Sequence, residues 1–420
     1  MQIVDIFKTP GLRRKVFIVL SLLLVTRIFT TIPIPYVDTS QLSAFFSGNG
    51  LLDLFNLFSG GGLSQLSIAM LGVGPYITSS IIMQLMTMIF PNLKKAFHEE
   101  GPVGRAKFNR ISRYLTVPLA LLQGYSFLNL LISQNALPPL STTKLIIDIL
   151  IITAGTMIFM WIGELISEQK IGNGTSLIIF AGIVSSLPQT IRFAIADYSP
   201  DKLNTYIAFI AVAIIVIAGV VFINEGERKV PVSYARRVRG NKLFGGVGTY
   251  LPLKVNQAGV IPIIFAVSIL LFPQLIATIF AAFSLPLNEF ITDYSNRLYQ
   301  NQLVYGIFYF LLVVLFTYFY TAITFDPAEI SKGLQRSGGF IPGIRPGEST
   351  AQFLTKIITR ITLPGALFLG TIAVLPNITQ AFTEAQQFAL GGTALLIVVA
   401  VALETRRQIE SQLSLREYDK

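Results

Sequence analysis

Residues 51–71 read LLDLFNLFSGGGLSQLSIAML, an apolar stretch that is interrupted at its centre by Gly60, Gly61 and Gly62 and that carries Ser and Gln side chains. It is too polar and too broken to face lipid, because non-helical backbone at membrane depth is tolerated only inside protein or against a water-filled cavity. Two structures fit this composition equally well. One is a short re-entrant helix on the external side that fills a cavity, and the other is an interfacial helix that lies on the outer leaflet.

On both sides of this stretch the chain consists largely of apolar runs. Of its 420 residues 52% are hydrophobic and only 13% are Asp, Glu, Lys or Arg, about half the roughly 25% that is usual in soluble domains. A soluble protein could not bury so much apolar surface with so few charges. This composition excludes a cytosolic enzyme, a disordered regulator and a secreted disulfide scaffold.

The number of apolar runs predicts the fold class. A bilayer core about 30 Å thick requires ~20 mostly apolar residues in each spanning helix. The fifth run is short and ends near Pro188. The runs predict an all-α, polytopic membrane protein with ten spans, at about 16–35, 72–90, 114–133, 145–166, 175–191, 203–223, 257–283, 303–325, 357–375 and 385–403.

The distribution of basic residues predicts the orientation. Of the 32 Lys and Arg residues, 27 lie on one side of the predicted spans and 4 on the other, while Arg27 lies inside the first span. Cytoplasmic loops carry the excess of Lys and Arg in membrane proteins. Both termini of this multi-pass chain are therefore predicted to be cytoplasmic.

Two long cytoplasmic connections, 224–256 and 326–356, predict docking surfaces. The first carries Arg236, Arg237 and Arg239 interleaved with aromatic residues, which is typical of surfaces that bind an acidic partner such as ribosomal RNA or an acidic protein face. The second contains FIPGIRPGE (340–348), whose prolines and glycines hold Arg345 on a shaped turn. The alternative interpretation is that these charges only orient the chain in the membrane.

Groups that carry catalysis are scarce. The chain has no Cys and a single His, His98, which excludes thiolate sites and any multi-histidine zinc site. No HExxH, GxSxG or Walker sequence occurs. We therefore predict that the chain is not an enzyme and that it has no catalytic, cofactor-binding or metal-binding residues.

Ionisable residues inside the spans are also few. Asp148 and Glu164 lie at the two ends of the fourth span, and Arg27 is the clearest intramembrane charge. A central charge costs about 2.5–3.5 kcal/mol on insertion scales, so we interpret Arg27 as a structural group that bonds carbonyls of a neighbouring broken helix. A secondary transporter of a small solute would need a mid-membrane ionisable residue. An intramembrane protease or lipid transferase would need a catalytic dyad or metal ligands.

Seven strings together identify a family. Between about residues 12 and 403, the chain resembles the SecY family, the central subunits of the bacterial protein-conducting channel. The strings that carry the resemblance are RIFTTIPIP (27–35), FNLFSGGGLSQLSI (55–68), PYITSSIIMQL (75–85), IGNGTSLIIFAGI (171–183), YLPLKVNQAGVIP (250–262), FIPGIRPGE (340–348) and GGTALLIVV (391–399).

The resemblance implies an architecture of two five-helix halves, inverted relative to each other, at residues 1–195 and 196–403, followed by a cytoplasmic tail at 404–420. It also implies that the interrupted stretch, at about 53–68, is a plug that fills the channel, which favours the cavity-filling alternative. The plug residues are Asn56, Phe58, Gly60, Gly61 and Gly62.

The resemblance further implies a ring of aliphatic side chains around the pore. Such a constriction dewets, seals against ions and deforms around a passing substrate. One position carries Val where Ile is frequent, which suggests a looser seal on that wall. The ring positions are Val73, Ile77, Ile179, Ile264 and Ile397.

A lateral gate is implied between the second and seventh spans, with the third span beside it. Thr78 and Phe272 match gate-facing positions, and Gln123 and Asn256 are the polar residues that clasp the closed gate. Interhelical polar bonds in lipid are worth roughly 0.6–2 kcal/mol, which is weak enough for a signal sequence to displace. Helix capping is the alternative role for Asn256.

The implied function is translocation of unfolded secretory polypeptides across the bacterial plasma membrane and lateral release of transmembrane segments into membrane lipids. The implied energy source is the motor ATPase SecA or the ribosome, docked on the two cytoplasmic loops, and the implied substrates are signal peptides and nascent chains. The small membrane subunits SecE and SecG are further implied partners. An accessory form that exports a narrow set of glycoproteins is a nearby alternative, although the full basic loop at 224–256 favours the housekeeping form.

Overall fold

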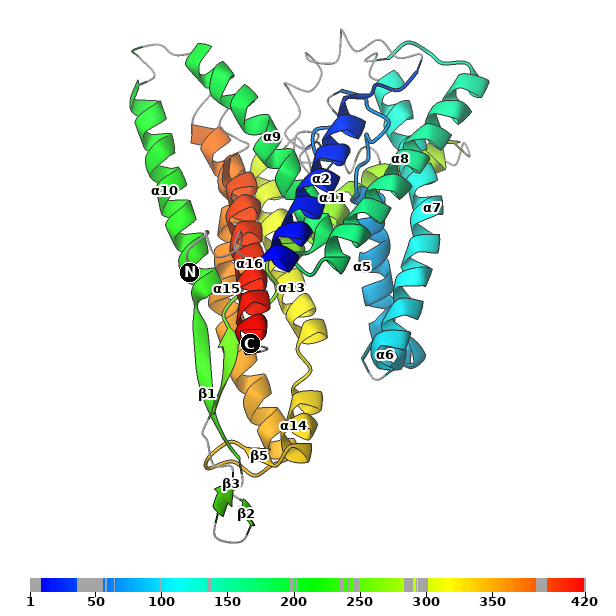
Figure 1. Ribbon diagram of the computed structural model, residues 1–420. Helices are drawn as coiled ribbons and strands as arrows, with labels where there is room; N and C mark the ends of the chain where they lie inside the picture. The colour runs from blue at the N-terminus through cyan, green and yellow to red at the C-terminus, as the bar shows by residue number, and fades with distance from the viewer. Residues whose placement is uncertain are drawn as a thin grey trace.

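The long apolar runs of the sequence are helices in the computed structural model of the chain (Figure 1). The structure describes residues 9–35, 56, 59–63, 65–98, 100–133, 137–196, 200, 203–234, 237–239, 242–244, 249–282, 290–291, 293, 301–382 and 391–418. Within them, ten long helices match the ten predicted runs in order. They are α2 (Pro10–Thr31), α5 (Gly74–Ile89), α7 (Gly101–Ser133), α8 (Thr142–Glu168), α9 (Gly174–Ala196), α10 (Leu203–Glu225), α11 (Ile261–Ala282), α13 (Gln302–Thr324), α15 (Glu348–Phe382) and α16 (Gly391–Tyr418).

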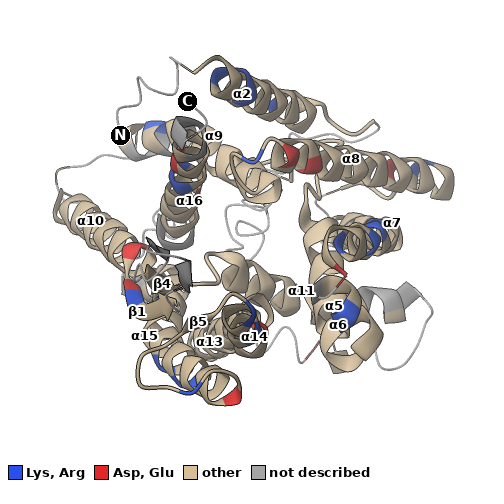
Figure 2. Ribbon diagram, turned by 60° about the horizontal axis from the view of Figure 1, so that its bottom comes forward, with Lys and Arg blue, Asp and Glu red and all other residues tan. Residues whose placement is uncertain are grey.

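The helices have the composition and surface of a membrane protein. By length and composition, five of those in the described ranges could cross a membrane, and they include α7, α8, α10 and α15; α9 and α11 contain shorter apolar stretches. On α10, Ile210, Ile214 and Phe222 are 58%, 62% and 78% exposed. Contiguous apolar surface of this kind marks contact with lipid or protein. In Figure 2, most of the length of the helices carries no charge.

Two helices extend beyond the predicted ends of their spans. The predicted end near Pro188 is wrong, because α9 runs through this proline to Ala196. Spanning helices tolerate proline because neighbouring groups satisfy the freed backbone atoms. The predicted cytoplasmic tail at 404–420 is helical as far as Tyr418, because α16 continues past the predicted end of the tenth span.

The two cytoplasmic loops of the sequence prediction are joined by a small sheet. Strand β1 (Glu227–Tyr234) lies between β4 (Thr249–Lys254) and β5 (Gly339–Phe340), and both neighbours are antiparallel to it. In register, Val230 faces Leu251 and Ser233 faces Phe340. A short hairpin, β2 (Arg237–Arg239) with β3 (Lys242–Phe244), extends from β1 at the lower end of the molecule in Figure 1.

This sheet has an apolar core of its own. Val230 and Val232 alternate along β1 and are buried, as an amphipathic strand requires. They pack with helix α14 (Pro327–Arg336) and with the first turns of α15 in one apolar cluster. We call the five strands, α14 and these turns of α15 the loop platform. The buried side chains of the cluster are Val230, Val232, Leu253, Ile341, Leu354, Ile357 and Ile358.

The main apolar core lies between the long helices, where α5, α9, α11, α13 and α16 contribute buried side chains to one cluster. Helix α11 packs against α5, α7 and α13, and α16 packs against α9, α10 and α15. The Lys15 ammonium donates to Gln412 Oε1 at 2.9 Å. The first turns of α2 therefore lie beside the last turns of α16, so both ends of the described chain are on the same side.

Candidate functional site

The five predicted ring residues meet in the main apolar core. Their exposed fractions range from 0% for Ile179 to 8% for Ile77, and all five belong to the same buried cluster. They come from different elements: Val73 immediately precedes α5 and Ile77 lies in its first turn, while Ile179, Ile264 and Ile397 lie on α9, α11 and α16. Side chains far apart in the sequence therefore belong to one aliphatic cluster.

In its described part the interrupted stretch is helical at Asn56 and forms a succession of turns at residues 59–63 and 65–71. Antiparallel backbone bonds tie it to the residues after α2: Ile34 N–H donates to Leu66 O at 2.8 Å, and Ile68 N–H donates to Ile32 O at 2.9 Å. From Ser59 onward the predicted short helix is replaced by turns, because left-handed φ angles at Gly60 (+73°), Gly61 (+84°) and Leu66 (+41°) are incompatible with an α-helix.

Among the predicted plug residues, the structure describes four. Asn56 is helical and half-buried, Gly60 and Gly62 are buried, and Gly61 is half-buried. Phe58 lies outside the described residues. We call Ser59–Gly62 the glycine turn, and the residues that follow it, 63 and 65–72, the anchored turns.

Arg27 has the structural role that the sequence predicts. Its Nη1 donates to the Gly60 carbonyl at 2.7 Å and to Ser185 Oγ on α9 at 2.8 Å. The buried Nε and Nη2 atoms have no hydrogen-bond partner among the described residues. One guanidinium therefore connects α2, the glycine turn and α9, and the interpretation that it bonds a carbonyl of the broken stretch is confirmed.

Two of the four predicted gate residues are in contact. Gln123 Nε2 on α7 donates to Thr78 Oγ1 on α5 at 3.4 Å, and both side chains are buried. Phe272 is half-buried on α11, which packs against both of these helices. The bond is at the long end of hydrogen-bond geometry, so it links the two helices weakly.

Asn256 lies in a different environment. Its Nδ2 donates to Asn224 Oδ1 on α10 at 2.8 Å and to the Gly259 carbonyl at 3.2 Å. The residue is 6% exposed, and within the described part of the chain its buried Oδ1 has no hydrogen-bond partner. The structure thus joins Asn256 to α10 and not to the Thr78–Gln123 pair.

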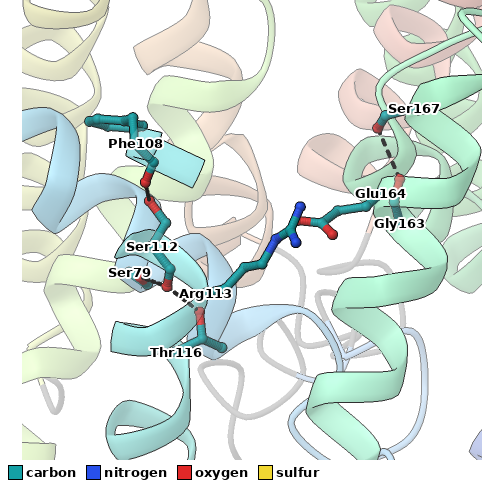
Figure 3. A network of polar contacts seen from close by, with 8 residues as sticks. All are labelled: Ser79, Phe108, Ser112, Arg113, Thr116, Gly163, Glu164 and Ser167. Atoms are coloured by element: carbon teal, nitrogen blue, oxygen red, sulfur yellow. Dashed lines mark hydrogen bonds and ion pairs between the residues drawn. The ribbon is translucent and has the colours of Figure 1, made fainter. Parts of the chain in front are cut away.

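A polar network that sequence reasoning missed connects α5, α7 and α8 (Figure 3). Ser79 Oγ on α5 donates to the Ser112 carbonyl on α7 at 2.6 Å, and this carbonyl also accepts from Thr116 Oγ1 at 2.8 Å. Arg113 on α7 forms an ion pair with Glu164 on α8, with 2.7 Å between Nε and Oε1. Small hydroxyl residues within an apolar run are the available signal, because such side chains bond across membrane helices.

A polar pocket of about 360 Å³ lies beside the aliphatic cluster, on the side of the loop platform. Helices α9, α11 and α16 each supply one ring residue. Residues one or two turns away on the same helices line the pocket. Burial lowers the pKa of Lys254 below its usual 10.5, with Arg407 adding to the shift, and burial raises the pKa of Glu404 above 4.5. The polar lining includes Asn173, Asn224, Lys254, Asn256, Glu404 and Arg407.

The end of α16 fastens this pocket to its surroundings. Arg407 Nη2 donates to the Asn224 carbonyl at 2.5 Å and lies 3.1 Å from Glu225 Oε2, which joins α16 to the end of α10. Gln412 Nε2 donates to the carbonyls of Gln169 and Lys170 after α8. Both contacts join residues far apart in sequence, which no local pattern reveals.

Three of the four predicted docking residues lie on the loop platform. Arg237 and Arg239 are in β2, Arg345 is exposed in the turn after β5, and Arg236 lies outside the described residues. Among the residues that the structure describes, no group of three or more His, Asp or Glu side chains is placed to hold a metal ion.

Comparisons with known proteins give one family. The chain matches the model of the SecY family over residues 67–406. "Protein translocase subunit SecY" of Streptomyces galbus is 43% identical over 431 aligned residues, which cover 98% of this chain and 97% of that protein. The protein of the same name from Mycobacterium bovis is 41% identical over 435 residues, with the same coverage.

Two solved structures share the fold. One, described as "The structure of a protein conducting channel", has a TM-score of 0.65 at 20% identity and covers 94% of this chain and 91% of its own. The other, "Sec61 in the Canine ribosome-channel complex from the endoplasmic reticulum", has a TM-score of 0.62 at 19% identity with the same coverage.

Proposed function

Because this chain belongs to the SecY family of protein translocase subunits, we propose that its buried aliphatic cluster is the constriction through which unfolded polypeptides cross the bacterial plasma membrane. It is a channel subunit and not an enzyme, as its family and fold indicate. The single observation that carries the assignment of the pore is the burial of Val73, Ile77, Ile179, Ile264 and Ile397 in one cluster drawn from four helices.

An aliphatic constriction suits this task physically. Water is not stable inside a narrow apolar ring and leaves it. An ion would have to give up its hydration shell to enter, so the dry ring excludes ions. Aliphatic side chains also adjust their packing around a passing chain without losing hydrogen bonds, because they make none. The same five residues therefore seal the resting channel and yield to an unfolded polypeptide of any sequence.

The proposed lateral gate opens between α5 and α11, with α7 beside them. The 3.4 Å bond between Gln123 and Thr78 links α5 to α7, so it does not cross this opening, but it holds α5 in place on one side of the gate and costs little to break. Phe272 on α11 completes the apolar lining of the gate. Asn256 acts at the other end of α11, where its bond to Asn224 holds α10.

The proposed docking surface is the loop platform. Arg237 and Arg239 belong to its hairpin, and Arg345 is exposed on a unit that its own apolar core holds in shape. Ribosomal RNA and an acidic face of the motor ATPase SecA are both suited to such a surface. The ribosome is further supported by the fold neighbour that is described as part of a ribosome-channel complex. SecE and SecG complete the proposed membrane assembly.

The proposed topology is ten spans in two five-helix halves, residues 1–195 and 196–403, with both termini in the cytoplasm. The contact between Lys15 and Gln412 supports termini on one side. That side carries 27 Lys and Arg residues and the other side carries 4, which supports the proposal that it is the cytoplasmic side. The platform and the polar pocket then face the cytoplasm, and the glycine turn faces outward.

Protease protection of a secretory precursor tests the proposed function. The full-length chain with its small partner is reconstituted in liposomes, and SecA, ATP and an unfolded precursor are added. We expect full-length precursor that is protected from external protease only when ATP is present. Absence of protection, in vesicles where a known translocase gives it, would contradict the proposal and direct the next assay to solute uptake.

A further inference from the structure

Asn173 and Gly174 join the loop after α8 to the first turn of α9. Asn173 is exposed and lines the polar pocket. It also caps α9, because its Oδ1 accepts from the Ser176 N–H at 3.3 Å and its carbonyl accepts from the Leu177 N–H at 2.9 Å. Small polar side chains are favoured at this position, since they satisfy backbone donors that a helix start leaves free. The cap therefore accounts for Asn at residue 173.

Packing against α8 requires glycine at the next residue. A Cβ atom at Gly174 would lie 1.8 Å from the carbonyl oxygen of Gly163 on α8, which is closer than real Cβ atoms approach other atoms. The Gly174 N–H donates to Ser167 Oγ at 2.9 Å, and the same hydroxyl donates to the Gly163 carbonyl at 2.9 Å (Figure 3). The two helices therefore meet so closely that only glycine fits after Asn173.

These two constraints place a chemically reactive dipeptide at an exposed site. Hydroxide removes the proton of a glycine N–H, and the nitrogen lone pair attacks Cγ of the preceding Asn; glycine has no side chain to hinder this ring closure. The Cγ–Nδ2 bond breaks, and ammonia leaves with a proton from water, which regenerates hydroxide. The cyclic succinimide that remains is opened by water to Asp or to isoaspartate. The net reaction therefore consumes water and releases ammonia, and it needs no oxidant or reductant.

We propose that Asn173 is a deamidation site and that Ser167 restrains the reaction in the folded chain. The attacking atom is the Gly174 nitrogen, whose N–H is bonded to Ser167 Oγ. The side-chain oxygen of Asn173 is also bonded, to the N–H of Ser176 in the same helix end. Both bonds must break before the nitrogen reaches Cγ. The junction of α8 and α9 therefore slows a reaction that its own sequence favours.

Deamidation would change two features beside the aliphatic cluster. The new carboxylate would lie in the wall of the polar pocket, which Lys254 and Arg407 also line. Isoaspartate adds a methylene group to the backbone before Gly174 and would displace the first turn of α9, whose second turn carries the ring residue Ile179. The inference itself does not rest on the proposed function, because it concerns the covalent stability of the chain.

Peptide mapping by mass spectrometry tests the inference on the full-length chain in lipid nanodiscs, where the buffer reaches both faces. The chain is incubated at mildly alkaline pH, and the Asn, Asp and isoaspartate forms of residue 173 are quantified over time. A synthetic peptide with the sequence of residues 170–177 gives the rate without the fold. We expect Asn173 to react about five- to a hundredfold more slowly in the folded chain, the factor that corresponds to two hydrogen bonds.

Three variants test the role of the hydroxyl. Ser167→Ala should accelerate deamidation of the folded chain about two- to tenfold, because it removes the acceptor of one neutral hydrogen bond. Ser167→Thr should keep the slow rate, since threonine retains the hydroxyl. Ser268→Ala on α11 is the matched control, because its Oγ also donates to the carbonyl four residues earlier, that of Ile264, at 2.9 Å. It should leave the rate at Asn173 unchanged.

Several results would overturn the inference. Absence of deamidation in the peptide would show that this sequence is not reactive. A folded chain that reacts as fast as the peptide would show that the junction gives no protection. Equal rates with and without Ser167→Ala would show that the hydroxyl is not the restraint. If Ser167→Ala also accelerated amide hydrogen exchange at Ile178 and Ile179, general loosening of α9 would replace the loss of one bond as the cause. None of these results bears on whether the chain translocates precursors, so the two proposals fail separately.

Discussion

The loop platform and the glycine turn are both interruptions between long helices, rich in glycine or proline, but different forces hold them. The platform combines a three-stranded sheet with seven buried apolar side chains. The glycine turn is held by polar and backbone contacts, namely the bond from Arg27, the bonds from Ser67 to the Gly62 carbonyl and the fit of Gly60 against Gly182.

The magnitudes show how differently the two regions are stabilised. Burying an aliphatic side chain contributes about 1.5–3 kcal/mol, so no single contact decides the conformation of the platform. A hydrogen bond to a charged group contributes about 1.5–3 kcal/mol, and in the glycine turn one such bond acts together with the two bonds that Ser67 donates to the Gly62 carbonyl. A docking surface needs a fixed shape, which the first arrangement provides.

The largest expected effect is at the ring, where apolar packing alone makes the seal. Ile77→Gly combined with Ile179→Gly should raise ion conductance across planar bilayers severalfold or more, because the aliphatic constriction is widened and wets. The matched control is Ile210→Gly with Ile214→Gly, which removes the same side chains from the exposed face of α10. Equal conductance in the two variants would place the seal elsewhere.

The platform provides the next largest effect. Leu354 is 0% exposed in its core, so Leu354→Ala should lower the local free energy of unfolding by about 2–5 kcal/mol. Amide hydrogen exchange in β1 and β4 should accelerate accordingly, while bilayer conductance stays unchanged. Leu363→Ala, at a residue 47% exposed on the same helix, should leave exchange unchanged. Slow exchange in both variants would refute the claim that this core holds the sheet.

A smaller effect is expected at the gate. Thr78→Val removes the acceptor of the 3.4 Å bond from Gln123, which is worth roughly 0.6–2 kcal/mol in a membrane. The rate at which an apolar segment moves from the channel into lipid should rise by less than about thirtyfold. Thr371→Val, at an exposed hydroxyl on α15, is the comparison. A slower release in Thr78→Val would contradict the proposal that this bond holds α5 in place in the closed gate.

The smallest effect concerns pH at the polar pocket. Burial raises the pKa of Glu404 above 4.5, so the folded chain binds this proton more tightly than the unfolded chain does. Stability from this group is present below pH 4.5 and is lost as the pH rises through the raised pKa. Glu404→Gln should make the melting temperature depend less on pH in this range. An unchanged slope would show that Glu404 does not contribute.

Most of the helical framework could be predicted from the sequence, because apolar runs of spanning length depend on local composition. The role of Arg27 could be predicted for the same reason: a charge inside such a run needs a polar partner. The sheet was not predicted, since its strands are short and its alternation is confined to Val230 and Val232. Its partner strand β5 comes from a second loop about a hundred residues away.

The parts of the site that could not be predicted are hydrogen bonds between residues far apart in the sequence. Asn256 was assigned to the gate from its position at the start of a span, but its partner Asn224 is set by how α10 and α11 pack. The bonds of Ser79 to the Ser112 carbonyl and of Gln412 to the carbonyls after α8 likewise join separate elements. A single sequence supplies the polar groups but not the pairing between them.

The central claim, that polypeptides pass through the aliphatic ring, has a direct test. A single cysteine is introduced by Ile264→Cys or Ile397→Cys in this cysteine-free chain, and a precursor with one Cys is stalled during translocation. The account predicts a disulfide between the stalled precursor and the cysteine at either ring position, and none with Ile210→Cys on the exposed face of α10. Equal disulfide formation at the exposed face, or none at the ring while the precursor is protected from protease, would contradict it.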